Sequence, residues 1–193
     1  MRPLHPDDWH PSLGHIIDAM DGRPLALHCL LANHPVLFNA WWNYRMYGVG
    51  GGDLTRRDAE LVILRVAVHM RAWYEWAAHV DRGMAAGLSL AEIKRVADGP
   101  SADGWRPSEA ALLLAVDELV RQHGISAATH ETLSDFLSER QVLDVVSLQG
   151  MYVTIACILG TWPVAVEDFV LSRLPPEVTE AAFLELLSAS HGH

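Results

Sequence analysis

The side chains best suited to chemistry lie in one apolar stretch, residues 55–88. Glu60, Glu75 and His79 can all transfer protons, and they interrupt a sequence that is otherwise typical of a protein core. Burying a carboxylate or an imidazole is costly unless it is paired, and burial shifts its pKa. Several such groups in apolar surroundings therefore favour a site for acid–base chemistry.

Glu75 and His79 are four residues apart, which places them on one face of a helix. A carboxylate at this spacing can orient the imidazole and tune its pKa, so we predict His79 as general acid or base and Glu75 as its orienting partner. Glu60 is the predicted second proton-transfer group. The alternatives are a surface pair between Glu75 and His79, worth a few tenths of a kcal/mol, and a Glu60 that only complements the helix dipole.

A straight helix would keep these groups apart. If one helix ran from Glu60 to Glu75, their Cα atoms would lie about 22 Å apart at about 1.5 Å per residue. A shared site therefore requires a break between His69 and Ala72, or a contribution from a second subunit.

Six further residues of the stretch are predicted to bind substrate. Arg65 could hold a substrate carboxylate, although a structural ion pair is the alternative, and His69 could instead be a core or bend histidine. The aromatic residues could shape a pocket or simply pack in the core, because ligand sites are largely apolar with a few polar anchors. The full predicted set is Arg65, His69, Arg71, Trp73, Tyr74 and Trp76.

The composition narrows the class of protein. The chain has 193 residues, of which 50% are hydrophobic, and a net charge of −10. This length predicts one domain, or two small ones sharing a core. An acidic chain without basic clusters argues against nucleic acid and anionic membranes as partners. The first residues lack the apolar segment of a signal peptide, and no apolar run reaches about 18 residues, so we expect no membrane span and a cytoplasmic location.

The two cysteines give little support to redox chemistry. Cys29 and Cys157 both lie in apolar helical surroundings, where we expect them to be small core residues. Because no CxxC is present, neither a thioredoxin-like redox motif nor a cysteine-based zinc site is indicated. Glu60, His69, Glu75 and His79 could coordinate zinc or iron, but HExxH and paired ExxH arrangements are absent. We therefore expect no metal and no cofactor.

The pattern is helical nearly throughout and lacks the alternation of half-buried strands, which predicts an all-α protein. Thr55 is a predicted N-cap, and Ser89 and Ser138 each begin a capping box. Residues 1–11, with three prolines, resemble an extended arm, and the glycine run 48–52 indicates a turn or hinge rather than a phosphate loop. Helices are expected over 12–21, 25–32, 35–47, 55–87 (with the break above), 89–97, 109–123, 126–137, 138–159 and 178–189.

Residues 55–93 resemble the carboxymuconolactone decarboxylase family, which also contains the alkyl hydroperoxidase D proteins. The family pattern is a threonine-capped helix with R-x-x-E and L-x-I-L-x-V, then a histidine, then G-L-[ST]-x-x-E-[IV]. The matching residues are Arg57, Glu60, Leu61, Ile63, Leu64, Val66, His79, Gly87, Leu88, Ser89, Glu92 and Ile93. Residues 109–153 also look like the family's second half, so the resemblance covers roughly 35–160.

One departure from the family pattern separates the two branches. The hydroperoxidase branch carries E…C-x-x-C-x-x-x-H, and its two cysteine positions fall on Ala72 and Glu75. Without these thiols the nucleophile of a thiol peroxidase is missing, so that activity is disfavoured. Glu60, Glu75 and His79 remain as a proton-handling set, which fits the decarboxylase branch better.

The resemblance implies a carboxymuconolactone decarboxylase-like helical bundle that forms homo-oligomers, with a trimer or hexamer favoured and a dimer possible. It divides the chain into an N-terminal arm with short helices (1–34), the family domain (35–160) and a C-terminal extension (161–193). The expected function is a cofactor-independent lyase or isomerase acting on a small carboxylated lactone or β-keto-type acid. The alternatives are a non-catalytic ligand-binding or assembly protein and a metal-dependent hydrolase or oxygenase.

Overall fold

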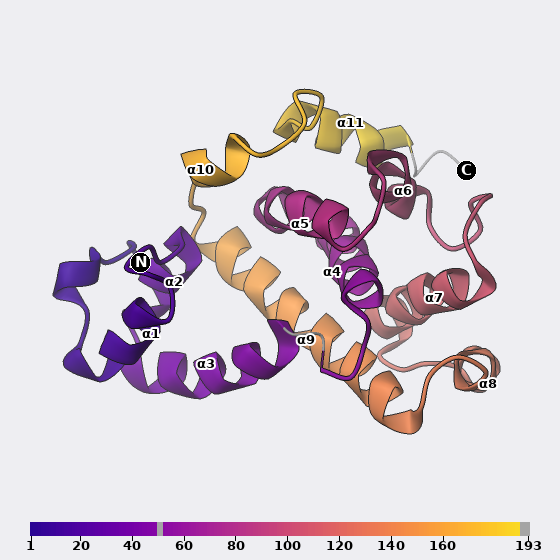
Figure 1. The fold of residues 1–193 in the computed structure, drawn as a ribbon, viewed down its shortest axis with the longest axis horizontal. Coiled ribbons are helices and arrows are strands. Elements are labelled where there is room, and N and C mark those ends of the chain that lie inside the picture. Colours follow the sequence, from indigo (N-terminus) through magenta and orange to yellow (C-terminus); the bar gives the residue numbers. More distant parts are fainter. Residues whose placement is uncertain (50–51, 190–193) are drawn as a thin grey trace.

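The computed structural model describes residues 1–49 and 52–189, and within them the chain is all-α, with no strand. This confirms the predicted fold class (Figure 1). The glycine run 48–52 lies partly outside the described residues. The helices are α1 (Gly14–Asp18), α2 (Ala26–Leu31), α3 (Pro35–Val49), α4 (Arg56–Met70), α5 (Trp73–Ala85), α6 (Leu90–Arg95), α7 (Pro107–Gln122), α8 (Ala127–Ser134), α9 (Glu139–Thr161), α10 (Asp168–Leu171) and α11 (Glu180–Ala189).

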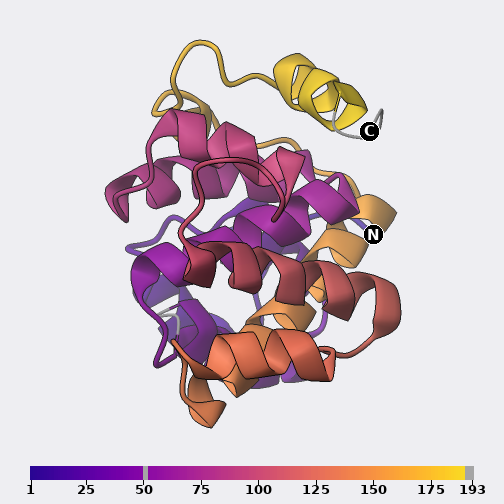
Figure 2. The ribbon, with the colours of Figure 1, turned by 90° about the vertical axis from the view of Figure 1, so that its right-hand side faces the viewer.

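Helix α4 is the centre of the bundle. It packs against α5, α7 and α9, and its residues 61–68 are all buried. A helix that is apolar on most sides requires neighbours on most sides, as its sequence predicts. Figure 2 shows the resulting layers, with α11 over α5 on one side and α7 and α8 on the other.

The expected break in residues 55–87 occurs at Arg71. Its backbone is left-handed (φ 52°), its N–H donates to Val68 O at 3.2 Å, and the N–H of Ala72 donates to Ala67 O at 2.9 Å. These two bonds form a Schellman motif, which ends α4 at a position where glycine is more usual. Because α5 starts at Trp73, the chain turns back along α4, and residues far apart in sequence can meet.

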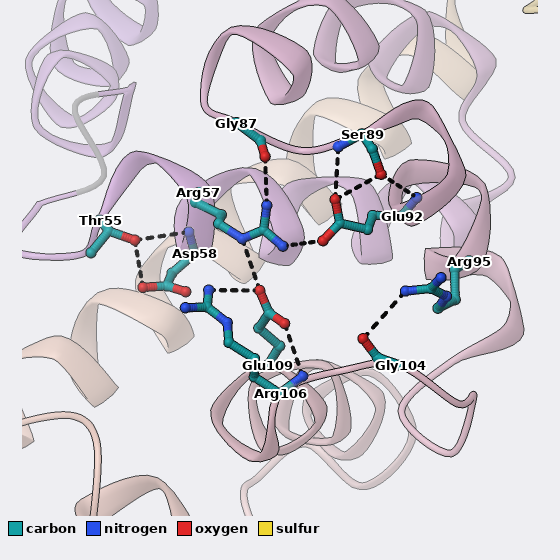
Figure 3. A network of polar contacts seen from close by, with 10 residues as sticks. All are labelled: Thr55, Arg57, Asp58, Gly87, Ser89, Glu92, Arg95, Gly104, Arg106 and Glu109. Carbon is teal, nitrogen blue, oxygen red and sulfur yellow. Dashed lines mark hydrogen bonds and ion pairs between the residues drawn. The ribbon is translucent and has the colours of Figure 1, made fainter.

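An arginine–glutamate network fixes the start of α4 to the rest of the domain (Figure 3). Arg57 donates to Glu109 Oε1 at 2.8 Å, to the carbonyl of Gly87 at 2.7 Å and to Glu92. Glu92 also closes the capping box of Ser89, and Arg106 donates to Glu109 at 2.8 Å. The arginine of the R-x-x-E pattern is therefore structural, since it joins α4 to the start of α6 and of α7.

Residues 1–11 and 162–179 form more regular structure than the sequence predicts. Residues 1–11 contain a 3₁₀ turn (Pro6–Asp8) and the start of a second (Pro11–Leu13), and Trp9 is buried. The prediction of an extended arm was therefore wrong. Helix α10 was not predicted. Just before it, Glu167 accepts hydrogen bonds from Ala26 N–H (2.6 Å) and Tyr74 Oη (2.7 Å). Glu167 therefore joins the start of α2 to α5. The boundaries 1–34, 35–160 and 161–193 stay a prediction.

Helix α9 is long and apolar enough to cross a membrane, with a mean hydropathy of 1.8 over its most apolar 18 residues. Sequence inspection missed this run. Half of that window is buried inside the bundle, and α9 packs along α4, which is the arrangement of a core helix. Cys157 lies on its exposed face and Cys29 is partly buried, so Cys157 is not the core residue that was expected.

Candidate active site

His79 forms a hydrogen-bonded pair with Glu60. Its Nδ1 lies 2.7 Å from Glu60 Oε2, and His79 is buried while the Glu60 side chain is 14% exposed. The turn at Arg71 brings the two together within one subunit. The carboxylate that orients His79 is therefore Glu60 and not Glu75, which corrects the prediction made from the four-residue spacing.

Arg82 determines the tautomer of His79. Its Nη1 lies 3.0 Å from His79 Nε2, and a guanidinium can only donate, so Nε2 carries a lone pair and Nδ1 carries the proton given to Glu60. Burial lowers the pKa of His79, and the positive charge of Arg82 lowers it further. The charge of Glu60 opposes both effects without cancelling them. His79 is thus a neutral, oriented imidazole whose basic nitrogen, Nε2, is covered only by Arg82, which suits a general base.

A cavity of about 260 Å³ lies beside this pair. We call it the dyad cavity; its lining comes from α4, α5, the turn after α5, and α9. It places two arginines close to the proton-transferring pair. Its lining residues are Arg56, Ala59, Glu60, Ile63, His79, Arg82, Ala85, Ala86 and Tyr152.

Glu75 faces a second, smaller cavity of about 40 Å³, here called the Glu75 cavity. Both of its carboxyl oxygens are buried and have no hydrogen-bond partner. Burial raises the pKa of Glu75 well above its usual range, so the side chain is a neutral acid. Three residues, His79, Arg82 and Tyr152, line both cavities. The structure therefore brings both Glu60 and Glu75 close to His79, but Glu60 lines the dyad cavity and Glu75 lines the Glu75 cavity.

The structure does not bring Arg65, His69 or Arg71 to His79. Arg65 is buried and holds Asp117 with two bonds of 2.6 and 2.8 Å, while its Nη1 donates to the carbonyls of Val96 and Ala97. The structural ion pair, the alternative for Arg65, is the arrangement found. The reason is helical geometry, because five residues turn the chain about 140° and point Arg65 away from Glu60.

His69 and Arg71 share the surroundings of Arg65. His69 Nε2 lies 2.7 Å from Asp117 Oδ1, and Arg71 is exposed. All three predicted residues line a separate cavity of about 360 Å³. None of them lines the dyad cavity or the Glu75 cavity, which corrects their placement beside the proton-transferring groups.

Of the three predicted aromatic residues, one lines a cavity beside His79 and two do not. Tyr74 lines the Glu75 cavity, with its hydroxyl donating to Glu167. Trp73 and Trp76 instead pack against Phe183 of α11, with ring centroids 6.1 and 4.9 Å apart. Trp76 also borders an apolar groove of about 330 Å³ between α5, α6 and α11. The two tryptophans hold the C-terminal helix in place and line neither the dyad cavity nor the Glu75 cavity, which corrects their predicted place around the proton-transferring groups.

Sequence reasoning missed the residues that complete the site. Arg82 lies three residues after His79, and this spacing on a helix was a signal that could have found it. Tyr152 packs against His79 with the two rings nearly perpendicular and their centroids 5.0 Å apart, but it comes from α9 and carries no local signal. Across residues 1–49 and 52–189, no group of three or more His, Cys, Asp or Glu side chains is placed to hold a metal ion.

Comparisons with known proteins agree with the family resemblance and with the all-α fold. Residues 35–118 match the model of the carboxymuconolactone decarboxylase family. The fold is similar to the crystal structure of an alkylhydroperoxidase AhpD core, an uncharacterized peroxidase-related protein from Ralstonia eutropha JMP134. The TM-score is 0.72 at 20% identity, covering 88% of this chain and 92% of that one. No functionally curated protein matches the sequence. The matched segment contains Glu60, Glu75, His79 and Arg82.

Proposed function

Because residues 35–118 match the model of the carboxymuconolactone decarboxylase family, we propose that this chain is a cofactor-independent lyase or isomerase that relocates a proton on a small carboxylated lactone or β-keto-type acid. The observation that carries the proposal is the neutral, buried His79, held between Glu60 and Arg82 at the edge of the dyad cavity. This arrangement provides a base, a group that stabilises its protonated form, and a cation for a carboxylate.

The proposed reaction begins when the substrate carboxylate binds the Arg82 guanidinium, with Arg56 nearby. The guanidinium then moves away from His79 Nε2. The freed nitrogen removes a proton from the carbon next to a carbonyl, and the electron pair of that C–H bond passes to the carbonyl oxygen as an enolate. Glu60 stabilises the imidazolium that results. In an isomerisation, the proton on His79 exchanges with solvent, and His79 then returns a proton to another carbon of the enolate.

The decarboxylation of a β-keto-type acid uses the same groups in a different order. The bond between the carboxylate and the α-carbon breaks, carbon dioxide leaves, and the electron pair of the broken bond forms the enolate. His79, protonated from solvent, then gives its proton to the carbon. One proton from water is consumed in each turnover, and no oxidant or reductant is required.

Proton NMR in D₂O tests the proposal. We expect protein incubated with carboxymuconolactone or with acetoacetate to place deuterium on the α-carbon of substrate or product. A ligand that binds and is recovered without deuterium, across a panel of such acids, would instead favour the non-catalytic binding protein. Activity that is lost with a chelator, together with metal found by elemental analysis, would favour the metal-dependent alternative.

Peroxidase activity is the second candidate, because the similar structure is described as peroxidase-related. The positions of its branch's two thiols are held by Ala72 and Glu75 here, and neither Cys29 nor Cys157 lines a cavity of His79. We therefore expect no reduction of cumene hydroperoxide by dithiothreitol in the presence of this protein. Turnover above the protein-free rate would reverse the order of the two candidates.

Arg82→Gln should weaken substrate binding more than chemistry. Glutamine can still donate to His79 Nε2 but carries no charge for a substrate carboxylate, and hydrogen bonds to charged groups contribute about 1.5–3 kcal/mol. We expect KM to rise about tenfold to a hundredfold with a smaller change in kcat. The matched control is Arg95→Gln, since Arg95 stacks on Trp105 away from both cavities. An unchanged KM would contradict the role of Arg82.

The pH profile should report the lowered pKa of His79. In the isomerisation, His79 is active as the neutral base. For a substrate that is isomerised, kcat/KM should therefore be constant near neutrality and should fall only at a pH below about 6.5, the usual pKa of histidine. The charged or titratable groups around it are Glu60, Arg82, Arg45, Glu75 and Tyr152. Because Glu60 raises the pKa of His79, Glu60→Gln should move this acidic limb to still lower pH. A limb at or above the usual histidine pKa would contradict the assignment.

The homo-oligomer, with a trimer or hexamer favoured, and the cytoplasmic location stay predictions. Sedimentation velocity measures the first directly.

A further inference from the structure

The buried polar atoms that lack hydrogen-bond partners are gathered in one place. Within the described residues, they are His28 Nε2, Trp41 Nε1 and both carboxyl oxygens of Glu75. All three residues line the Glu75 cavity, although they come from α2, α3 and α5. Buried polar groups are nearly always paired, and each unpaired one therefore needs a physical explanation. Three that face one cavity point to a ligand.

The three side chains present mainly donors. His28 Nδ1 accepts the N–H of Leu25 at 3.1 Å, so in the neutral imidazole the proton lies on Nε2. Burial, with Arg45 and Arg82 nearby, lowers the pKa of His28 to about 3, which keeps that ring neutral. Trp41 Nε1 can only donate, and the protonated Glu75 offers one O–H. A ligand that satisfies all of them must be rich in acceptors.

The charge around the cavity points the same way. Arg45 and Arg82 both line it, and in the described part of the chain neither forms an ion pair with a carboxylate. Arg45 lies over the ring of Trp42, 4.7 Å from its centre, and Arg82 donates to His79. Glu75, the one acid in the lining, makes no hydrogen bond to either arginine. Two cations without a counter-ion, beside three free donors, favour an anion.

The size of the cavity limits that anion. About 40 Å³ is open to atoms the size of water. Since one water needs about 10–15 Å³ by this measure, the cavity has room for roughly three or four non-hydrogen atoms. A carboxylate group has three such atoms and four lone-pair positions for hydrogen bonds.

We propose that the Glu75 cavity is a carboxylate-binding site, in which Glu75 donates a hydrogen bond to the bound carboxylate alongside His28 Nε2 and Trp41 Nε1. The carboxylate comes either from a free short-chain acid or from the substrate in the dyad cavity, which shares His79, Arg82 and Tyr152 with this one. Only the second source rests on the proposed function.

The binding should depend on pH through Glu75. An ionised Glu75 would repel the ligand, so affinity for a carboxylate should be constant below the pKa of Glu75 and fall about tenfold per pH unit above it. The titratable or charged groups that face Glu75 are His28 from α2, Arg45 from α3, Tyr74, His79 and Arg82 from α5, and Tyr152 from α9. Glu75→Gln keeps a donor but cannot ionise, so it should bind with little dependence on pH.

Isothermal titration with sodium acetate at constant ionic strength, from pH 5.5 to 8.5, tests the site. We expect wild-type protein to bind acetate, and Glu75→Leu and Trp41→Phe to bind it about tenfold or more weakly. Trp73→Phe is the matched control, because Trp73 packs on Phe183 outside the cavity. Glu75→Leu removes a buried carboxyl without a partner, so it should fold and melt no lower than wild type. No acetate binding by wild type, or equal affinity in Glu75→Leu, would overturn the proposal.

Kinetics with acetate distinguish the two sources. If the substrate carboxylate occupies the site, acetate should raise KM and leave kcat unchanged; if the ligand is a free acid, acetate should bind without raising KM. Either result supports the site. A protein that binds acetate but processes no lactone or β-keto acid would keep this site and lose the proposed function.

Discussion

His79→Asn is expected to lower kcat by about 10²–10⁴-fold, the usual contribution of a general acid or base. Asparagine is close in size to the imidazole and can still accept from Arg82 and donate to Glu60, so the surroundings should survive. What it lacks is a nitrogen that can take up and return a proton near neutral pH. Initial rates measured by NMR on the best substrate of the panel, with a thermal melt of the variant, give the comparison.

His69→Asn is the matched control for this experiment. His69 is partly buried and, like His79, lies 2.7 Å from a carboxylate, that of Asp117, but it faces a different cavity. Its replacement should leave kcat unchanged. If His69→Asn abolished turnover and His79→Asn did not, the reaction would belong to the cavity of Arg65, His69 and Arg71. Full activity in His79→Asn would remove His79 from the mechanism.

The sequence predicted the parts of the fold that depend on neighbouring residues. Thr55, Ser89 and Ser138 each cap their helices as expected, because an N-cap signal needs only the next three residues. The break near Arg71 was one of two expected ways for Glu60 and Glu75 to share a site, the other being a contribution from a second subunit. The left-handed arginine at this break was not predictable, because glycine is the usual signal for that conformation.

The choice of partners in the site was beyond the sequence. A spacing of four residues brings Glu75 near His79, but side-chain directions depend on packing, and Glu75 faces the small cavity while Glu60 reaches His79 across the hairpin. Arg65 gave no sign of its partner, because Asp117 lies 52 residues away. His28 and Trp41 join the site only because the N-terminal helices pack over α5 and α9. The sequence did contain one signal for His28, because it is a titratable residue inside an apolar run. The same signal pointed to Glu75.

Asp117→Ala is expected to destabilise the fold by about 3–5 kcal/mol, because it leaves the Arg65 guanidinium buried without its counter-ion. Both partners are about 6% exposed, and Asp117 also accepts from His69. Urea unfolding followed by circular dichroism measures the difference. The matched control is Arg140→Ala, which breaks an exposed pair with Asp53 and should cost about 0–1 kcal/mol. A loss of similar size in both variants would contradict the argument from burial.

Two further measurements separate the ion pair from simple loss of packing. The double variant Arg65→Met/Asp117→Leu removes both charges, so it should recover most of the stability that Asp117→Ala loses.

Burial alone would raise the pKa of Asp117, but hydrogen bonds from His69 and Arg65 and the charge of Arg65 outweigh it and lower that pKa from 3.8 to about 2. The contribution of Asp117 is therefore complete above the usual aspartate pKa and is lost as the pH falls from about 4 to about 2. In Asp117→Ala that part of the acid dependence should disappear; if it persisted, other carboxylates would be its source.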